Sequence, residues 1–342
     1  MIQKMRKVPS QDLQNLLHQV FLKYGFTKEK AQILAQVHME STLDGISSHG
    51  INRVPLFIEY VKKALVNPEA EPMKLEAFGN MERWDGQRAS GVLNALSCTN
   101  RAIELAQHHG MGLVALRNTN HWMRGGTYGW MAARAGCISI CFTNTIANMP
   151  PWGGKESRIG NNPFIVSIPR EKGRHVVLDM AMSQFAFGKI HDFQLKGEQL
   201  PFPGGWDEHD ELSVEPEKIL ASERGLPIGY WKGSAFSVIL DMLATILSGG
   251  DSTSRISARG KETGISQVFL CIDPEAFHDR SLREKLLEEI IAYTHDVEPM
   301  FEGARTYYPG ERTLNTRTRN LKEGIPVSEE IWQKVLKIAE ND

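Results

Sequence analysis

The sequence predicts a protein of the α/β (α+β) class, in which a helical domain is followed by a domain of mixed helices and strands. Up to about residue 65, apolar side chains recur only at helical spacing. After about residue 70, short runs rich in β-branched residues alternate with helical segments. Two of these runs, at 164–169 and 175–182, flank the turn REKGR and predict an antiparallel hairpin. A simple alternating β–α repeat would not join two strands so directly.

Three helices are predicted in the N-terminal part, over residues 10–24, 27–43 and about 50–67. The first two begin at hydroxyl side chains, which can cap the free amides of a first turn, and they end at glycines. Pro68 prevents the third helix from continuing. His49 is therefore expected in the short connection between the second and third helices.

The rest of the chain is expected to mix both element types. The predicted helices cover 92–109, 126–135, 233–250, 281–295 and 328–340, and the further strands cover 112–118, 137–144 and 266–273. Residues 188–230, rich in glycine, proline and acids, predict a long surface connection, and 251–264 a polar, mobile segment. The predicted domains are 1–75, joined by the C-terminal helices within 281–342, and an α/β domain at 76–280.

Composition restricts the partners. The chain has 342 residues, and its 39 basic and 41 acidic side chains give a net charge of -2, so neither nucleic acid nor an anionic membrane is expected to bind. The basic start lacks the apolar core of a signal peptide, and no run approaches the roughly 18 apolar residues of a membrane span. The four cysteines lack C-x-x-C spacing and predict buried, reduced thiols in a cytoplasmic protein.

The stretch SSHGINR at 47–53 offers a candidate for catalysis. His49 would lie at a helix N-terminus, where free amides and the helix dipole favour an anion. Arg53, one turn further on, can present a bidentate fork to a carboxylate. The imidazole could then donate a proton to the oxygen of a carbonyl that is being reduced. The alternative is a serine cap with His49 as a surface residue, and these residues alone leave it open.

A second candidate is His121 in NHWMRGG at 120–126, just past a predicted strand end, where ligand sites of open sheets often lie. A hydrogen-bonded structural histidine explains it equally well. His49, His121 and Asp179 could also bind Zn²⁺, although H-E-x-x-H and cysteine clusters are absent, so no metal site is predicted. The usual nucleotide motifs, G-x-G-x-x-G after a strand and the P-loop, are absent too, which disfavours a standard Rossmann half.

Taken together, several motifs make the chain resemble the malate/L-lactate dehydrogenase family that lacks a Rossmann fold. They are SSHGINR, WDGQRASG, NHWMRGGTYGW, PPWGGKESRIGNNPF, LDMAMS, YWKGSAFSVILDML and YPGER, and they span about residues 10–335 in the family's order. The resemblance implies a homodimeric, cytoplasmic reductase whose nicotinamide-binding domain has a mixed, largely antiparallel sheet. It also implies that His49 is the proton donor, and it assigns Arg53 and His121 to the substrate's carboxylate and carbonyl.

The resemblance further implies a cofactor, NADH or NADPH, and a small 2-oxo sugar acid as substrate. It assigns cofactor contacts to three segments, with the residues His175, Val176, Val177, Leu178, Asp179, Met180 and Ala181, then Trp231 and Lys232, then Gly310, Glu311 and Arg312. Within the same class, the alternatives are reductases of pyruvate, oxaloacetate or a cyclic imino acid. From other classes, they are a metal-dependent hydrolase or lyase and a non-catalytic binder of sugar acids.

Overall fold

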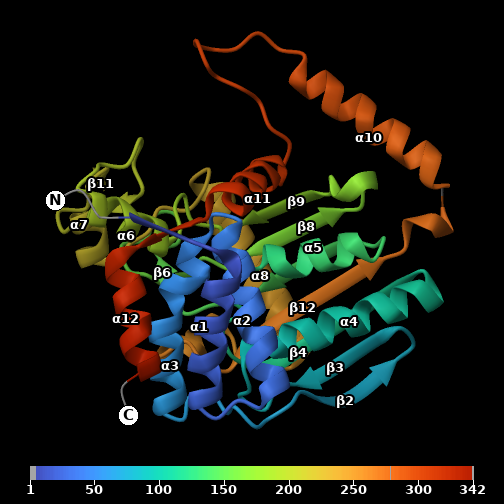
Figure 1. Ribbon diagram of the computed structural model, residues 1–342, viewed down its shortest axis with the longest axis horizontal. Helices are drawn as coiled ribbons and strands as arrows, with labels where there is room; N and C mark the ends of the chain where they lie inside the picture. The colour runs from blue at the N-terminus through green and yellow to red at the C-terminus, as the bar shows by residue number, and fades with distance from the viewer. Residues whose placement is uncertain (1–4, 278, 341–342) are drawn as a thin grey trace.

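The computed structural model describes residues 5–277 and 279–340, and it begins with a layer of helices (Figure 1). This layer contains α1 (Ser10–Lys23), α2 (Lys28–Leu43), α3 (Val54–Lys62) and the C-terminal α12 (Glu329–Glu340). Strand β1 (Met5–Val8) pairs antiparallel with β13 (Ile325–Ser328) and so ties the two ends of the chain together. One apolar core, with Leu17, Phe21, Leu34, Phe57 and Val335 fully or almost fully buried, holds the layer.

The connection before α3 differs from the prediction. The third helix was expected from about Gly50, but two single 3₁₀ turns, Ser47–His49 and Ile51–Arg53, precede α3. Thr42 Oγ1 accepts a hydrogen bond from Ile51 N at 3.0 Å and so fastens the second turn to α2. A Cβ atom at Gly50 would overlap Thr42 Oγ1, which explains why glycine follows the histidine here.

A seven-stranded sheet forms the centre of the molecule, in the order β2-β3-β4-β12-β5-β8-β9. Only β3 and β4 run parallel, so the predicted mixed, largely antiparallel sheet is confirmed. The predicted hairpin at 164–182 is also confirmed, as β8 and β9. The strands are β2 (Met73–Phe78), β3 (Met81–Asp85), β4 (Met111–Thr119), β5 (Ile138–Thr143), β8 (Phe164–Ile168), β9 (Val176–Met180) and β12 (Ile265–Ile272).

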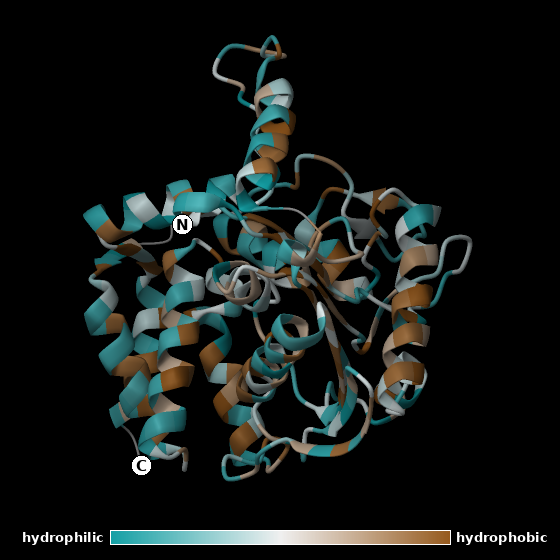
Figure 2. Ribbon diagram, turned by 90° about the vertical axis from the view of Figure 1, so that its right-hand side faces the viewer, coloured by the Kyte–Doolittle hydropathy of each residue, from teal (hydrophilic) through white to brown (hydrophobic). Residues whose placement is uncertain are grey.

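Helices cover both faces of the sheet because its strands are apolar on both sides. Phe269 and Cys271 of β12 point to the face covered by α4 (Gly91–His109) and α5 (Gly126–Arg134). Val268, which directly precedes Phe269, packs on the other face with Leu240 and Ala244 of α8 (Trp231–Ser248). In Figure 2, the sheet separates the helices near the chain ends from α8 at the opposite edge.

The prediction of a long surface connection over 188–230 is wrong in part, because the segment contains helices and strands. It contains most of α6 (Phe187–Lys196), the short strands β10 (Gly205–Trp206) and β11 (Leu212–Ser213), and α7 (Pro216–Ser222). A small core of Ile190, Leu200 and Ile219 holds these pieces together. The polar segment at 251–264 likewise contains a short helix, α9 (Thr253–Ala258).

Smaller elements complete the chain. Strands β6 (Ala147–Met149) and β7 (Ile159–Gly160) pair beside α8, and single 3₁₀ turns lie at Glu171–Gly173 and Pro274–Ala276. Helix α10 (Arg280–His295) projects from the molecule with the loop behind it, and α11 (Glu311–Glu323) leads back to the helical layer (Figures 1 and 2). The division into domains at 1–75, 76–280 and 281–342 stays a prediction; residues 341–342 lie outside the described part.

Two further observations concern surface and chemistry. No helix in the described part of the chain is long and apolar enough to span a bilayer. All four cysteines, Cys98, Cys137, Cys141 and Cys271, are unpaired and buried, as predicted, and burial raises the pKa of each thiol.

Candidate active site

A cavity of about 700 Å³ lies where the helical layer meets the carboxyl end of β4 and the edge strand β9. Its walls come from the end of α2, the first 3₁₀ turn, the loop at 120–126 after β4, and parts of α6 and α11. A cavity of this size accommodates a large organic ligand. Elements distant in the sequence therefore converge on one ligand-sized space.

The structure brings together the two histidines that the sequence singled out. His49 and His121 both line the cavity, and their rings stack with centroids 5.6 Å apart and planes inclined by 26°. Ser48 Oγ lies 3.2 Å from His49 Nδ1, which leaves Nε2 of His49 for a ligand. His121 Nδ1 accepts a hydrogen bond from the backbone N–H of Met123 at 2.9 Å. Two histidines that are 72 positions apart in the sequence therefore meet in a single site.

The histidine pair is held in its neutral form. Burial, together with the positive charges of Arg53 and Arg124, lowers the pKa of His49 to about 4. Burial also places the pKa of His121 well below its usual range, again with a contribution from Arg53. A negative charge beside these rings would counteract that effect and favour the imidazolium.

Arg53 lies next to the histidine pair and outside the set of residues that line the cavity. Its charge acts on His49 and on His121, which shows that its guanidinium is close to both. The side chain of Arg53 makes no hydrogen bond or ion pair with any other residue that the structure describes. Its five donors are therefore available to an incoming carboxylate.

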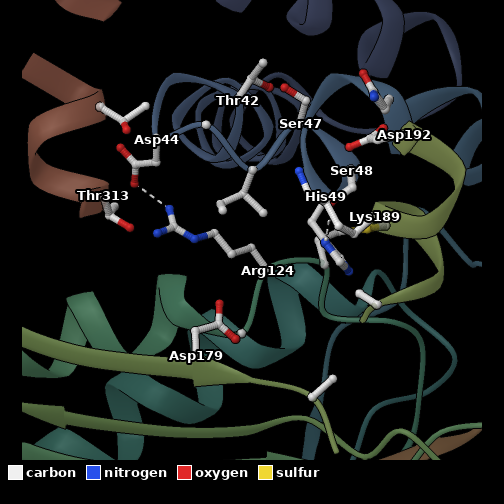
Figure 3. A pocket seen from close by; sticks show the side chains of 18 of the residues that line it. Thr42, Asp44, Ser47, Ser48, His49, Arg124, Asp179, Lys189, Asp192 and Thr313 are labelled. Atoms are coloured by element: carbon white, nitrogen blue, oxygen red, sulfur yellow. Dashed lines mark hydrogen bonds and ion pairs between the residues drawn. The ribbon is translucent and has the colours of Figure 1, made fainter. Parts of the chain in front are cut away.

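A buried ion pair crosses the cavity, and the sequence analysis did not predict it. Arg124, 5% exposed, extends from the loop after β4 to Asp44 at the end of α2, with Asp179 of β9 on its other side (Figure 3). Arg317 of α11 also bonds Asp44, at 2.9 Å. The one available signal was the position of Asp44, because an acid at a helix C-terminus opposes the helix dipole and needs a partner.

Part of the predicted cofactor segment lies on the cavity wall. Asp179 and Ala181 line it, and Asp179 Oδ2 accepts a hydrogen bond from Gly126 N at 2.8 Å. Burial raises the pKa of Asp179, against the opposing charge of Arg124. The neighbouring residues Val176, Val177, Leu178 and Met180 complete strand β9. His175 instead lines a second, smaller cavity near α10.

Of the other two predicted cofactor segments, one lies partly at the cavity and the other lies outside it. Arg312 lines the cavity, and the Gly310 turn lies against β9, because Val177 N donates to Pro309 O at 2.9 Å. Glu311 is engaged elsewhere, by His295 at 3.1 Å and Arg305 at 3.1 Å. Trp231 and Lys232 open α8 on the far face of the sheet, outside the cavity lining. The sequence did not single out the remaining charged side chains of the lining, Lys189, Asp192, Lys196 and Arg319.

Metal ligation finds no support in the arrangement of side chains. Within residues 5–277 and 279–340, no group of three or more His, Cys, Asp and Glu side chains is placed to hold an ion. His49 and His121 face each other as stacked rings, whereas zinc ligands direct their ring nitrogens at a common point.

Comparisons with known proteins agree with the resemblance seen in the motifs. The family model described as malate/L-lactate dehydrogenase matches residues 8–336. Proteins from Citrobacter koseri and Escherichia coli, both named 2,3-diketo-L-gulonate reductase, are 42% identical over 330 residues, which is 96% of this chain and 99% of theirs. A solved malate dehydrogenase from Pyrococcus horikoshii is 26% identical with a TM-score of 0.90, covering 99% of this chain and 98% of its own. The chain therefore belongs to the malate/L-lactate dehydrogenase family and is an oxidoreductase.

Proposed function

We propose that this protein reduces 2,3-diketo-L-gulonate to 3-dehydro-L-gulonate with a nicotinamide cofactor, NADH or NADPH. The 42% identity over nearly the whole chain to proteins named for this reduction carries the substrate assignment. Membership of a dehydrogenase family implies the nicotinamide. The paired histidines beside an unpartnered arginine provide the groups that the reduction of a 2-oxo acid requires.

The cavity fits a nicotinamide dinucleotide in volume and in charge. The side chains of Lys196 and Arg319 line it without a hydrogen bond or ion pair to any other described residue, so both remain available to phosphate oxygens. A side chain at Gly310 would lie 3.1 Å from Val177 N and 3.4 Å from His175 O, so glycine keeps this turn close to β9. When bound, the cofactor would supply the hydride that adds to the carbonyl carbon.

His49 is proposed as the proton donor. As the carbonyl carbon gains a hydride, the π electrons move to the oxygen, and the resulting alkoxide takes a proton from a ring nitrogen of His49. The low pKa of His49 means that its ring is neutral in the free protein near pH 7. The substrate's carboxylate therefore has a second task, because its negative charge raises the fraction of imidazolium.

Arg53 and His121 are proposed to hold the substrate. The unpartnered guanidinium of Arg53 suits a bidentate contact with the carboxylate. His121 Nδ1 accepts from Met123, so the ring proton lies on Nε2, where it can be donated to the carbonyl oxygen. Fixing both ends of the 2-oxo acid would turn a random encounter into an aligned one.

A homodimer and a cytoplasmic location complete the proposal. Beyond its first turn, helix α8 exposes five large apolar side chains on its outer surface, and such a stripe on a surface helix favours association. They are Phe236, Ile239, Met242, Leu243 and Ile246. Trp231 and Lys232, the predicted cofactor contacts outside this cavity, open the same helix, so dimerisation could bring them to a partner's site. Four unpaired cysteines fit a reducing compartment.

The test measures reduction of the substrate through the loss of absorbance of NADH, and separately of NADPH. With 2,3-diketo-L-gulonate we expect rapid oxidation of at least one of them, and slower oxidation with pyruvate or oxaloacetate. If pyruvate or oxaloacetate is reduced and 2,3-diketo-L-gulonate is not, the substrate assignment fails while the oxidoreductase assignment stands. The second candidate substrate class is favoured by the fold shared with malate dehydrogenase.

A further inference from the structure

A buried carboxylate, Glu262, lies behind the histidine pair. It belongs to the segment between α9 and β12, and its side chain is 15% exposed. Oε2 accepts a weak hydrogen bond from Ile146 N at 3.4 Å. Oε1 is buried and accepts no hydrogen bond from the residues described. A carboxylate oxygen left in this state costs stability, so its presence calls for a reason other than folding.

The unpartnered oxygen of Glu262 faces His121. The distance from Oε1 to His121 Nε2 is 3.7 Å, which is longer than a hydrogen bond, so the carboxylate can attract the Nε2 proton by its charge without taking it up as a hydrogen bond. His121 Nδ1 is already occupied as an acceptor from Met123 N. The ring proton is therefore on Nε2, directed to the side on which Glu262 lies.

The same carboxylate is the counter-charge of Arg53. Arg53 counteracts the effect of burial on the pKa of Glu262, which places the two charges close together. The side chain of Arg53 has no hydrogen-bond partner among the described residues, so Glu262 is a negative charge that can attract its guanidinium. Tyr60 of α3 is also close to Glu262, and burial, with a contribution from the carboxylate of Glu262, raises the pKa of that phenol. The groups around Glu262 are thus His121, Arg53 and Tyr60.

We propose that Glu262 is a positioning residue, whose ionised carboxylate orients the Nε2–H of His121 and the guanidinium of Arg53 toward the 2-oxo acid. The inference rests on the proposed function, because it assigns to Glu262 the alignment of the two groups that hold the substrate. Glu262 itself acts through these neighbours. A loss of its charge should therefore affect catalysis more than folding.

The direction of the pH effect follows from burial. Burial raises the pKa of Glu262 above its usual value, so the carboxylate loses its charge as the pH falls through that raised pKa. Turnover of the wild-type enzyme should consequently decline on the acid side. A buried acid with a raised pKa lowers the free energy of unfolding near neutral pH, and this destabilisation vanishes at low pH. Removing the charge should relieve this penalty.

The experiment compares wild-type protein with Glu262→Gln, which keeps the side-chain shape and removes the charge. We expect kcat/KM for the 2-oxo acid that the wild type reduces fastest to fall about 10- to 100-fold. The acid decline of kcat should disappear, and Tm near neutral pH should be equal or higher. The exposed Glu208→Gln, whose side chain is 61% exposed, is the matched control and should change none of these.

The fall of kcat at low pH is the measurement that tests the positioning role of Glu262. If it persists in Glu262→Gln, or if kcat/KM is unchanged, the positioning role is overturned. A lower Tm with full activity assigns Glu262 to the fold and also overturns it. If the glutamine variant does not fold, Glu262→Asp should keep the acid decline with reduced kcat, and unchanged kcat overturns the proposal. The Tm comparison needs no turnover, so a failure of the substrate assignment is recognised separately.

Discussion

His49 can act as an acid only when something negative approaches it. Its pKa of about 4 leaves the free protein with a neutral ring near pH 7, and Arg53 and Arg124 both oppose protonation. Binding of the substrate and protonation of His49 are therefore coupled, since a carboxylate beside Arg53 favours the protonated ring. A bound anion would thus activate its own proton donor, and a neutral ligand would not.

This link predicts a pH profile. The imidazolium fraction in the free protein falls about tenfold per pH unit above the pKa, so kcat/KM for reduction should fall with that slope between about pH 5 and 8. The decline of kcat should begin at a higher pH, because the bound carboxylate raises the pKa of His49. Steady-state kinetics over this range provide the measurement.

The variant His49→Asn should lower kcat about 10²- to 10⁴-fold and abolish the alkaline decline, because asparagine cannot titrate. Binding of the cofactor, followed by fluorescence, should remain. Near-normal turnover in a variant that binds the cofactor would show that another group donates the proton.

At the scale of elements, the site is assembled by loops that buried contacts hold in place. Asp44 and Arg124 are 7% and 5% exposed, and together with Arg317 they connect the end of α2, the loop after β4 and α11. Ion pairs that are largely shielded from solvent therefore connect the walls of the cavity. Such a pair tolerates the loss of one partner poorly.

Asp44→Asn should consequently destabilise the protein by about 3–5 kcal/mol, because it leaves the buried Arg124 without its carboxylate. Denaturant unfolding measures the effect. Glu59→Gln, which breaks the exposed pair with Lys63, is the control and should cause no measurable change. An equally small change for Asp44→Asn would mean that water or Asp179 compensates Arg124.

The sequence indicated those elements whose apolar periodicity is strong. The first two helices, the β8–β9 hairpin and α8 follow from side-chain spacing and turn residues. Helices α6 and α7 are too short to be stable alone, and they form because Ile190, Leu200 and Ile219 pack together. No local pattern encodes that packing. These two helices therefore form because of contacts between residues that are distant in the sequence.

The candidate site shows the same division. His49 and His121 stood out because each lies in a distinctive local motif, but their contact across the fold could not be read from spacing. Glu262 lies in a polar segment that resembled an ordinary loop, and its burial depends on contacts with the loop after β4, with α3 and with the loop between β5 and β6. Asp44 escaped notice for a related reason, since its arginine partner is 80 residues away.

At the scale of the whole molecule, the exposed apolar surface predicts association. Ile246 is 71% exposed and Met242 53%, both on the outer side of α8. Exposed side chains of this size gathered on one helix usually mark an interface. Helix α10 adds a second such surface, with Ile290 63% and Tyr293 86% exposed.

We expect light scattering after size exclusion to give the mass of a dimer. Ile246→Glu should shift it toward the monomer, because a carboxylate at the centre of an apolar interface would be desolvated without a partner. Phe78→Glu, at an 81% exposed position at the tip of the β2–β3 hairpin, should leave the mass unchanged. A monomeric wild type would remove the basis for placing Trp231 and Lys232 at a partner's site.

The contact between Val177 and Pro309 has a consequence for solubility. Strand β9 is the last strand of the sheet, and the outward N–H of Val177 is bonded by the carbonyl of Pro309. An open strand of this kind would offer its backbone to other chains as a template for aggregation. The turn that leads into α11 thus shields the sheet margin from intermolecular pairing, and a ligand held between this turn and β9 would strengthen the same shield.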